Sequence, residues 1–450
     1  MMNDIFVILQ YCLGHKGNIS NVVASMDWQK LYFFTSNQAI LGLCFDGIER
    51  LGEEYPEELR LNPIGRELLM TWMGKAQQIR RQNRMVNTVA SKLFSMLRED
   101  GLRCCILKGQ GNALMYPNPH SRTPGDIDVW VNASREEITE YGKKHFCLSD
   151  DIRFHHLETS LDGVPVELHF FPGIMNNPVF NARLQKWFKR NADLQCSHIV
   201  GLPDGAGEIA VPTLAFNVIY QLTHLYHHFF DEGIGMRQII DYFLVVCDFY
   251  KVYQNSSKTH PSSLTLKGGS TAFPKPLSPQ GTGDVTALRC SEPLRYKDGG
   301  ASKPSPDCLS ASASKVSPNC AGWDRLGVSG DTTFAAFDVV QKELKYLGLW
   351  KFAGAVMYVL HEVLGLPEEK MIAPMDEKRG KLLLAEILNG GNFGRHFTKY
   401  GHFTQQGMAK KYFLKIWRNM HFVRYYPAEA LSEPIFRTWH YFWRKVHGSV

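Results

Sequence analysis

The amino-acid sequence predicts an α+β fold in which a small mixed β-sheet lies between two helical regions. Short segments rich in β-branched and apolar residues are concentrated between residues 101 and 211, and apolar residues that alternate with polar ones are typical of strands. Before this stretch and after residue 212, apolar residues recur at the spacing of amphipathic helices. Strands mixed with helices in this way indicate an α/β or α+β core.

The N-terminal region, 1–100, is expected to be helical. An apolar stripe extends from Trp28 to Ile48, and the segment from Leu68 to Leu97 is amphipathic throughout. We expect these helices to lead into the sheet or to pack on it.

The sheet core is expected within residues 101–211. The predicted strands are 103–107, 127–131, 152–160, 164–170, 198–202 and 209–211. Asp162-Gly163 is a typical hairpin turn, so the third and fourth of these strands should be antiparallel neighbours. A helix from Ser134 to His145 would serve as the crossover, and a short helix is expected from Gln110 to Met115.

A second helical region is predicted for 212–253 and 331–450. Pro212 suits the first turn of a helix, and the expected helices are 214–230, 236–250, 332–347, 349–364 and 378–388. The intervening stretch, 254–330, is crowded with Ser, Pro, Gly and Thr and follows neither hydrophobic period. We expect it to be a disordered insertion, because it cannot bury enough apolar surface to offset the entropy of ordering it.

Composition narrows the class of protein. A chain of 450 residues with 44% hydrophobic and 21% charged residues can hold two cored domains and is ordinary for a globular protein. No apolar run is long enough to span a membrane. Asp4 stands where a signal peptide needs positive charge, and the ten cysteines contain no Cys-x-x-Cys pair. These features predict a cytoplasmic protein with reduced thiols.

The net charge of +6 is not by itself a sign of nucleic-acid binding. The expected insertion alone contains nine basic and five acidic residues, so most of the excess lies outside the predicted folded regions. We therefore do not expect nucleic acid as a partner.

Two acids one residue apart are the strongest functional signal. Asp126 and Asp128 flank Ile127 at the start of an apolar strand, so both carboxylates point to one face. Glu167 in the second hairpin strand would complete a three-carboxylate cluster if that strand lies beside the first. Such a cluster is costly unless cations neutralise it, and it predicts a site for one or two Mg²⁺ ions that also bind a nucleoside triphosphate, such as ATP.

These motifs resemble a known group. Leu107-Lys108-Gly109, Tyr116-Pro117, Arg122, Gly125-Asp126-Ile127-Asp128 and Val166-Glu167-Leu168-His169 are similar to those of a bacterial family of uncharacterised nucleotidyltransferases within the DNA polymerase β superfamily. The similarity extends to His227/His228, Arg237, Asp241 and Tyr426-Pro427-Ala428-Glu429-Ala430. The resemblance implies a polymerase β-like core with a helical domain beside it.

The resemblance also implies roles for individual residues. Asp126, Asp128 and Glu167 would be the catalytic residues and metal ligands, and Lys108, Gly109, Gln110 and Arg122 would bind the nucleotide. His169, His228, Arg237 and Asp241 would lie on the acceptor side. The reaction would transfer a nucleoside monophosphate from the triphosphate to a hydroxyl group on a small molecule, a sugar or a protein.

One position departs from the superfamily pattern. Gly109-Gln110 replaces the usual Gly-Ser, whose serine helps hold the phosphates. Backbone amides at the start of the following helix could still bind phosphate, with charge from Lys108 or Arg122. The alternative is a catalytically silent relative that binds nucleotide and acts as a scaffold or regulator.

Two further patterns remain open. His224 and His228 share a helix face, which suits either a metal site or packing. Between 395 and 450, ten basic residues and two glutamates are interleaved with many aromatic residues. We expect two amphipathic helices whose aromatic residues pack inward. Peripheral contact with an anionic membrane is the next alternative, and stacking on nucleic acid is the third.

Overall fold

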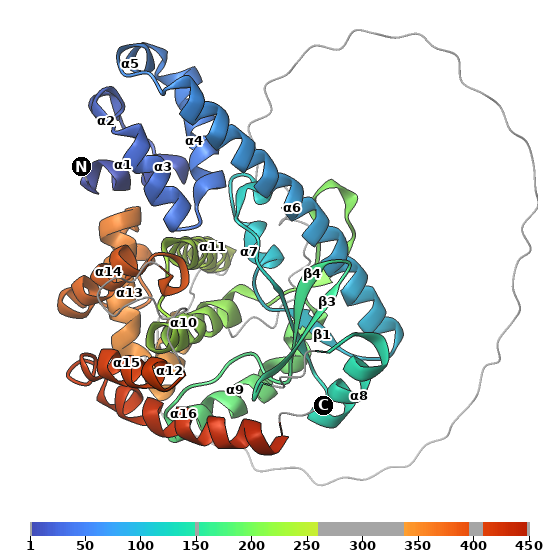
Figure 1. Ribbon diagram of the computed structural model, residues 1–450. Helices are drawn as coiled ribbons and strands as arrows, with labels where there is room; N and C mark the ends of the chain where they lie inside the picture. The colour runs from blue at the N-terminus through green and yellow to red at the C-terminus, as the bar shows by residue number, and fades with distance from the viewer. Residues whose placement is uncertain (1, 149–152, 260–336, 396–407, 448–450) are drawn as a thin grey trace, which may run out of the picture. The chain divides into compact units, whose positions relative to one another are not determined.

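The α+β architecture is built around one mixed sheet (Figure 1). The computed structural model describes residues 2–148, 153–259, 337–395 and 408–447. The four-stranded sheet has the order β1-β2-β4-β3, and a separate two-stranded sheet pairs β5 with β6. The strands are β1 Cys104–Ile106, β2 Ile127–Val131, β3 His156–Leu161, β4 Val164–His169, β5 Ile199–Gly201 and β6 Glu208–Ala210. The predicted small mixed sheet is therefore present, and all its strands lie within 101–211.

The pairing of β2 with β4 is the feature that positions the site. These strands are parallel, whereas β1 pairs with β2 and β3 pairs with β4 in antiparallel fashion. The predicted turn joins β3 to β4, and Asp162 and Gly163 have φ of 49° and 79°, which asparagine, aspartate and glycine tolerate best. The turn fixes the register of β3 on β4, and the register of β2 on β4 determines that Glu167 faces the same way as Asp128.

The face of the sheet that carries Asp128 is covered by helices. Trp130, two residues along β2, stacks on Phe216 of α10 (Leu214–Asp231) with ring centroids 6.1 Å apart. It also contacts Phe188 of α9 (Pro178–Ser197) at 6.2 Å. Because side chains of a strand alternate, α10 extends over the same face that bears the acids.

The N-terminal region is helical, as predicted. Its helices are α1 Met2–Cys12, α2 Ser20–Ser25, α3 Trp28–Asn37, α4 Leu41–Glu54, α5 Pro56–Leu61 and α6 Arg66–Glu99. The expected single stripe from Trp28 to Ile48 is two helices, because Ala39 adopts a left-handed φ of 56° between them. The 34-residue α6 agrees with the predicted long amphipathic helix.

Two shorter helices and one long one lie within the sheet region. α7 is Gln110–Ala113 and α8 is Arg135–His145, and Ser134 caps α8 through a capping box with Glu137. The 20-residue α9 was not predicted from the sequence. Its signals are Asn177, whose side chain caps the helix, and Pro178 at its first position.

The later helices agree with the second predicted helical region. They are α10, α11 Met236–Thr259, α12 Phe337–Tyr346, α13 Trp350–Leu364, α14 Glu377–Gly390, α15 Met408–Met420 and α16 Pro427–His447. Residues 254–259 belong to α11, so the first part of the expected insertion is helical. The rest of that stretch, from residue 260, lies outside the described residues.

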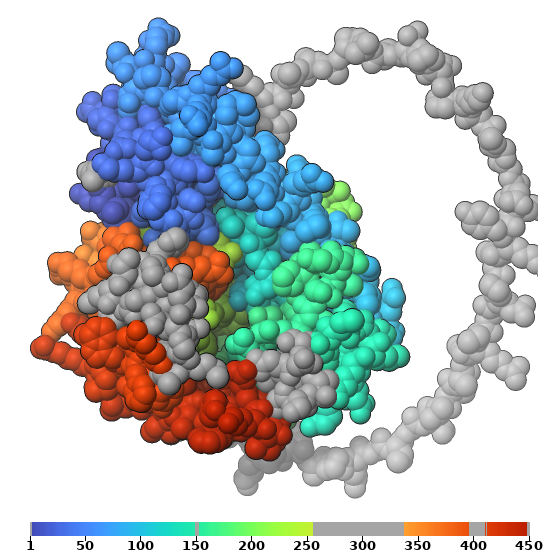
Figure 2. All heavy atoms as spheres, viewed as in Figure 1, coloured from blue at the N-terminus to red at the C-terminus, as the bar shows by residue number. Residues whose placement is uncertain are grey.

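The C-terminal helices are drawn in red at the surface of the molecule in Figure 2. They bury some of their aromatic residues and expose others. Phe422 and Tyr426 are buried, as the packing interpretation expects. Phe413, Ile435 and Phe442 are 68%, 73% and 60% exposed. In the described part of the chain, no helix is long and apolar enough to cross a bilayer.

Candidate active site

Asp128 and Glu167 lie side by side on the parallel strands β2 and β4. The strand register pairs them directly. Asp128 is buried, whereas the Glu167 side chain is 23% exposed and Asp126, just before β2, is exposed. The condition under which Glu167 would join the acids is therefore met, because β2 and β4 are neighbours in this register; a slip of one residue would turn Glu167 to the opposite face.

Two basic side chains contact these acids. Lys108 lies two residues after the end of β1, and its Nζ lies 3.0 Å from Asp128 Oδ1. The same Nζ lies 3.2 Å from Nε2 of His224 on α10. His169 Nε2 lies 3.2 Å from Asp128 Oδ1 and 3.1 Å from Glu167 Oε2. Asp128 thus accepts from two different elements of the fold, which holds its carboxylate in place.

The contacts separate the pKa values of the acids. Burial favours neutral Asp128, but Lys108 and His169 outweigh burial and hold the pKa of Asp128 well below its usual range. Burial likewise opposes ionised Glu167, and the hydrogen bond from His169 lowers the pKa of Glu167. The negative charge of Asp128 raises the pKa of Asp126 to about 6. Against the effect of burial, Asp128 and Glu167 raise the pKa of His169 to about 9.

The residues present fit a divalent metal ion. One ligand atom from each of Asp128, Glu167 and His169 lies within 4.8 Å of the others. Asp128 Oδ2 is buried and has no hydrogen-bond partner among the described residues, and carboxylate oxygens left in this way favour a cation. Asp126 does not belong to this group of Asp128, Glu167 and His169. Of the three carboxylates predicted to form a cluster, only Asp128 and Glu167 therefore have ligand atoms close together in this conformation.

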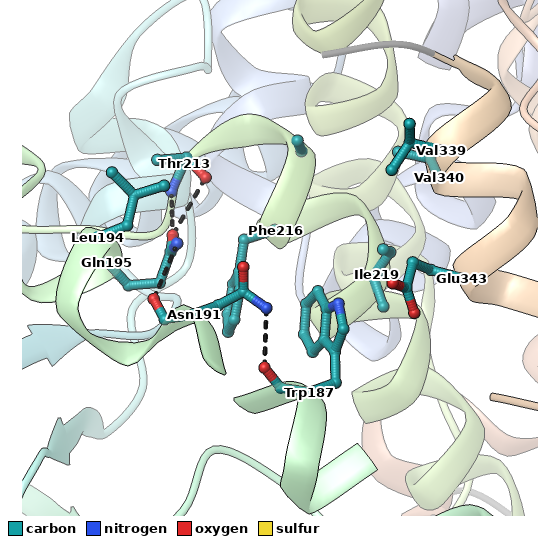
Figure 3. Close-up of a pocket in the computed structure, with 11 residues that line it drawn as sticks. Trp187, Asn191, Leu194, Gln195, Thr213, Phe216, Ile219, Val339, Val340 and Glu343 are labelled. Carbon is teal, nitrogen blue, oxygen red and sulfur yellow. Dashed lines mark hydrogen bonds between the residues drawn. The ribbon is translucent and has the colours of Figure 1, made fainter. Parts of the chain in front are cut away.

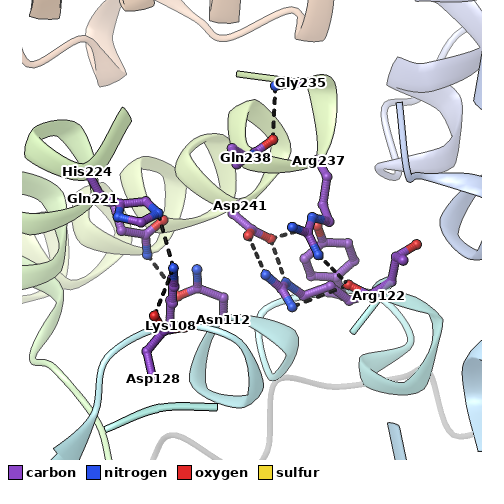
Figure 4. A network of polar contacts seen from close by, with 12 residues as sticks. Lys108, Asn112, Arg122, Asp128, Gln221, His224, Gly235, Arg237, Gln238 and Asp241 are labelled. Carbon is purple, nitrogen blue, oxygen red and sulfur yellow. Dashed lines mark hydrogen bonds and ion pairs between the residues drawn. The ribbon is translucent and has the colours of Figure 1, made fainter. Parts of the chain in front are cut away.

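A narrow pocket opens beside the acids (Figure 4). Lys108, Asp126 and Asp128 form one side of it, and α10 and α11 form the other with His224 and Arg237. Its cavity volume is about 30 Å³, which is space for one water molecule. Phe393, after α14, also lines it.

Arg122 and Asp241 lie in this pocket but bind each other. Arg122 Nε and Nη2 donate to Asp241 Oδ1 and Oδ2 at 2.9 and 2.8 Å, and Tyr116 donates to Oδ1 at 2.8 Å. All three side chains are buried. This bidentate pair fastens the loop before β2 to α11, so the charge of Arg122 is already matched by a carboxylate.

Arg237 is the more available of the two arginines. Its Nη1 donates to Thr123 O at 3.0 Å, and its buried Nε has no hydrogen-bond partner among the described residues. Its guanidinium lies 5.5 Å from the centre of the Phe393 ring. A buried guanidinium N–H without an acceptor favours an anion in the pocket.

Gly109 and Gln110 differ in their position relative to the pocket. Gly109 lines the pocket and has φ of 61°, a conformation that glycine adopts without strain. The Gln110 side chain instead hydrogen-bonds to Asn87 of α6, in the core. It does not line the pocket, and α7 has only four residues, too short to supply a strong dipole for phosphate.

The histidines of α10 divide between two environments. His224 contacts Lys108 in the pocket, whereas His228 lies against His224 and Phe393, with ring centroids 4.3 and 5.3 Å away, and does not line the pocket. Burial, then His227 and Lys108, lower the pKa of His228 to about 3. The described residues show no metal-binding group that contains His224 and His228, so packing is the interpretation that the structure favours.

The 426–430 segment lies away from the pocket. Glu429 is buried at the start of α16 and accepts from the backbone amides of Asn176 and Asn177 at 2.6 and 3.2 Å. Tyr426 packs against Phe229 and Phe230 of α10. These contacts hold α16 against the start of α9. The role that they give to residues 426–430 is structural.

Sequence reasoning missed several residues around the site. Asn112, Gln221, Gln238 and Phe393 line the pocket, and Asn112 Oδ1 accepts from Gln221 Nε2 at 2.8 Å. For Asn112, Gln221 and Gln238 the only sequence signal was their position on predicted helices, and Phe393, which follows α14, had none. A second hollow, between α9, α10 and α12, is mostly apolar (Figure 3). Its polar contacts include the hydrogen bond from Thr213 N to Gln195 Oε1 at 2.8 Å, which satisfies a backbone amide at the N-terminus of α10.

Comparison with known proteins agrees with this geometry. Searches of curated proteins and of solved structures found no match. A family described as uncharacterised nucleotidyltransferase matches residues 24–252, which include β1 to β6, α10 and most of α11. The match ends before the 426–430 segment, whose resemblance to the family stays a prediction. Since half of the sequence matches and the matched part contains all of the predicted acids, the chain belongs to this family of nucleotidyltransferases.

Proposed function

We propose that this protein transfers a nucleoside monophosphate from a nucleoside triphosphate to a hydroxyl group of a small molecule, a sugar or a protein. The observation that carries the proposal is the parallel pairing of Asp128 with Glu167, beside Lys108 in a pocket that also contains Arg237. Carboxylates and cations placed together suit a reaction in which a metal-bound triphosphate meets fixed positive charge.

Each residue has a role that follows from its position. Asp128 and Glu167, with Asp126 after a change of rotamer, would hold the divalent ions, for which the sequence predicts Mg²⁺. Bound ions would neutralise the phosphates and lower the pKa of the acceptor hydroxyl. Lys108 and Arg237 would contact phosphate oxygens. The acceptor oxygen bonds to the α-phosphorus, the bond to pyrophosphate breaks, and Glu167 is placed to receive the acceptor proton.

The test is direct transfer. The full chain is incubated with each nucleoside triphosphate and a divalent metal, and adducts on protein or small molecules are identified by mass spectrometry. We expect Asp128→Asn to reduce transfer by roughly 100-fold or more. The same change at Asp162, which is exposed at the β3–β4 turn and paired with Lys92, should leave transfer unchanged. Transfer by Asp128→Asn at the wild-type rate would refute the proposal.

A second function class is favoured by one observation. Gln110 is turned into the core against Asn87, so no side chain from this position reaches the phosphates. We infer that a catalytically silent, nucleotide-binding scaffold is the alternative. It predicts a nucleotide-dependent rise in melting temperature without any adduct, whatever the triphosphate or metal.

A further inference from the structure

Lys108 is held from both sides of the pocket that it lines. Its Nζ lies 3.0 Å from Asp128 Oδ1 on β2 and 3.2 Å from His224 Nε2 on α10, and Figure 4 shows the ammonium between these two side chains. An ammonium group has three N–H donors. With Asp128 and His224 on two sides, one N–H is left over, and the described residues offer it no acceptor.

The contact with Lys108 requires a neutral His224. An ammonium only donates, so Nε2 must be the ring nitrogen with the lone pair, and the proton must lie on Nδ1. Burial, and then the charge of Lys108, hold the pKa of His224 well below its ordinary value. The ring packs against Tyr220 and His228, one helical turn away on either side, with centroids 6.1 and 4.3 Å distant. His224 therefore presents a fixed acceptor to Lys108.

A neutral acceptor on α10 is important because acids attract Lys108 from the sheet side. Despite burial, Asp128, Asp126 and Glu167 together raise its pKa. The lysine stem is flexible, and an ammonium that moved between these carboxylates would compete with a divalent ion for their oxygens. His224 belongs to the helical side of the pocket, so its contact opposes such a movement.

We propose that His224 is a positioning residue, which holds Lys108 on the α10 side of the acids and leaves its third N–H for a phosphate oxygen of the nucleoside triphosphate. The inference rests on the proposed function, because that function supplies the triphosphate. It does not depend on transfer, since His224 neither gains nor loses a proton and only orients Lys108.

The experiment measures binding of a nucleotide that does not react. The full chain is titrated with Mg²⁺ and the α,β-methylene analogue of each nucleoside triphosphate, and the Kd is measured by calorimetry. His224→Phe keeps an aromatic ring but removes the acceptor, and should raise the Kd about tenfold. His224→Gln places an amide oxygen near the position of Nε2, and should stay within about threefold of the wild type. His198→Phe, whose histidine precedes β5 and contacts Val211 O at 2.9 Å, is the control and should leave the Kd unchanged.

A double-mutant cycle separates positioning from packing. Lys108→Met should raise the Kd about tenfold or more. Adding His224→Phe to Lys108→Met should raise it no further, because His224 acts only through Lys108. The inference is overturned if the two losses add in full, if His224→Phe binds as the wild type does, or if His224→Gln binds as weakly as His224→Phe.

The tautomer of His224 gives a second test, which holds even if His224→Phe does not fold. In ¹⁵N NMR of the histidine-labelled wild type, the His224 signals are identified by their loss in His224→Gln and should show a protonated Nδ1 and an unprotonated Nε2. A protonated Nε2 would overturn the inference. The expected cycle in a protein that transfers no nucleotide would refute the proposed function alone. Transfer by the wild type, with an unchanged Kd in His224→Phe, would refute this inference alone.

Discussion

At the scale of single residues, Lys108 is the side chain on which the charge balance of the site depends. Its ammonium lies between Asp128 and His224, and Asp128, Asp126 and Glu167 together raise the pKa of Lys108 despite its burial. An ion pair in which both partners are shielded from water is difficult to break, because the remaining charge has no solvent to replace its partner.

The buried pair gives a prediction with an internal control. Lys108→Met should lower the free energy of unfolding by about 3 kcal/mol, because it leaves buried Asp128 with only one of its two positive partners, His169. Lys92→Met removes a lysine that lies 2.7 Å from Asp162 with both side chains about half exposed, and should cost at most about 0.5 kcal/mol. Urea denaturation of both variants, without metal, measures the difference. If the two variants lost the same free energy of unfolding, the ion pair of Lys108 with Asp128 would stabilise the fold no more than the surface pair of Lys92 with Asp162.

The residues of the site were predictable in kind but not in arrangement. Asp126, Asp128 and Glu167 were predicted from their types and spacing, and Lys108 from the resemblance to the nucleotidyltransferase family. That His156 lies against Glu167 depends on the β3–β4 register, and that Gln110 faces Asn87 depends on where α6 crosses the sheet. Contacts between residues distant in sequence follow from packing, which a single sequence does not encode locally.

At the scale of elements, the buried pair of Arg122 and Asp241 connects the loop before β2 to α11. Arg122→Lys should destabilise the protein by roughly 2 kcal/mol, because lysine cannot make the bidentate contact. Arg103→Lys, at an exposed pair with Asp193 2.9 Å away, is the control and should change stability by less than about 0.5 kcal/mol. Thermal and urea unfolding test this, and a nearly neutral Arg122→Lys would contradict the role given to the pair.

The junction of α9 and α16 predicts a dependence on pH. Burial raises the pKa of Glu429 to about 7, against the hydrogen bonds from Asn176 and Asn177. The folded protein then holds this proton more tightly than the unfolded chain does, so the free energy of unfolding should fall as the pH rises from about 4.5 to about 7, by up to roughly 3 kcal/mol.

Glu429→Gln should abolish this decrease of the free energy of unfolding with rising pH. Glu67→Gln, at an exposed position on α6, should leave the decrease unchanged. Urea denaturation across the pH window measures both. If the free energy of unfolding of the wild type instead rises between about pH 4.5 and 7, as it does in Glu429→Gln, Glu429 is ionised in the folded protein.

Elements were predictable where local signals were strong. The strand 127–131 and the Asp162-Gly163 turn were predicted correctly, because alternation and turn chemistry are local properties. The break between α3 and α4 falls at Ala39, a residue that ordinarily favours helix, so tertiary contacts outweigh its propensity there. α9 was missed although Phe180, Leu184, Trp187 and Phe188 recur at helical spacing after its Asn177-Pro178 start.

At the scale of the whole molecule, α15 and α16 present an apolar stripe to solvent. On α16 it consists of Leu431, Ile435, Trp439, Phe442 and Val446, which are 45–76% exposed and recur at helical spacing. Both glutamates of these helices, Glu429 and Glu433, are buried. The exposed charges of the described C-terminal helices are therefore basic, which matches an anionic lipid surface.

We expect the protein to float with vesicles that contain an anionic lipid and not with purely zwitterionic ones. The double change Ile435→Glu and Phe442→Glu should reduce binding by about tenfold or more. Phe33→Glu, at a 67% exposed position of α3, should not. Equal recovery with both kinds of vesicle would contradict this expectation, as would sedimentation showing that the stripe is buried between two copies of the chain.

The hydrophobic core has a consequence for how the family segment behaves by itself. Buried residues form one cluster from Ile5 to Ala430, and Phe229 and Phe230 of α10 pack on Phe422 at 4.5 and 5.8 Å. The matched segment, 24–252, therefore contains all of the acids but only part of the core that supports them. A fragment cut at its borders would expose the apolar side of α10, so the unit of homology in this protein is smaller than the unit that folds.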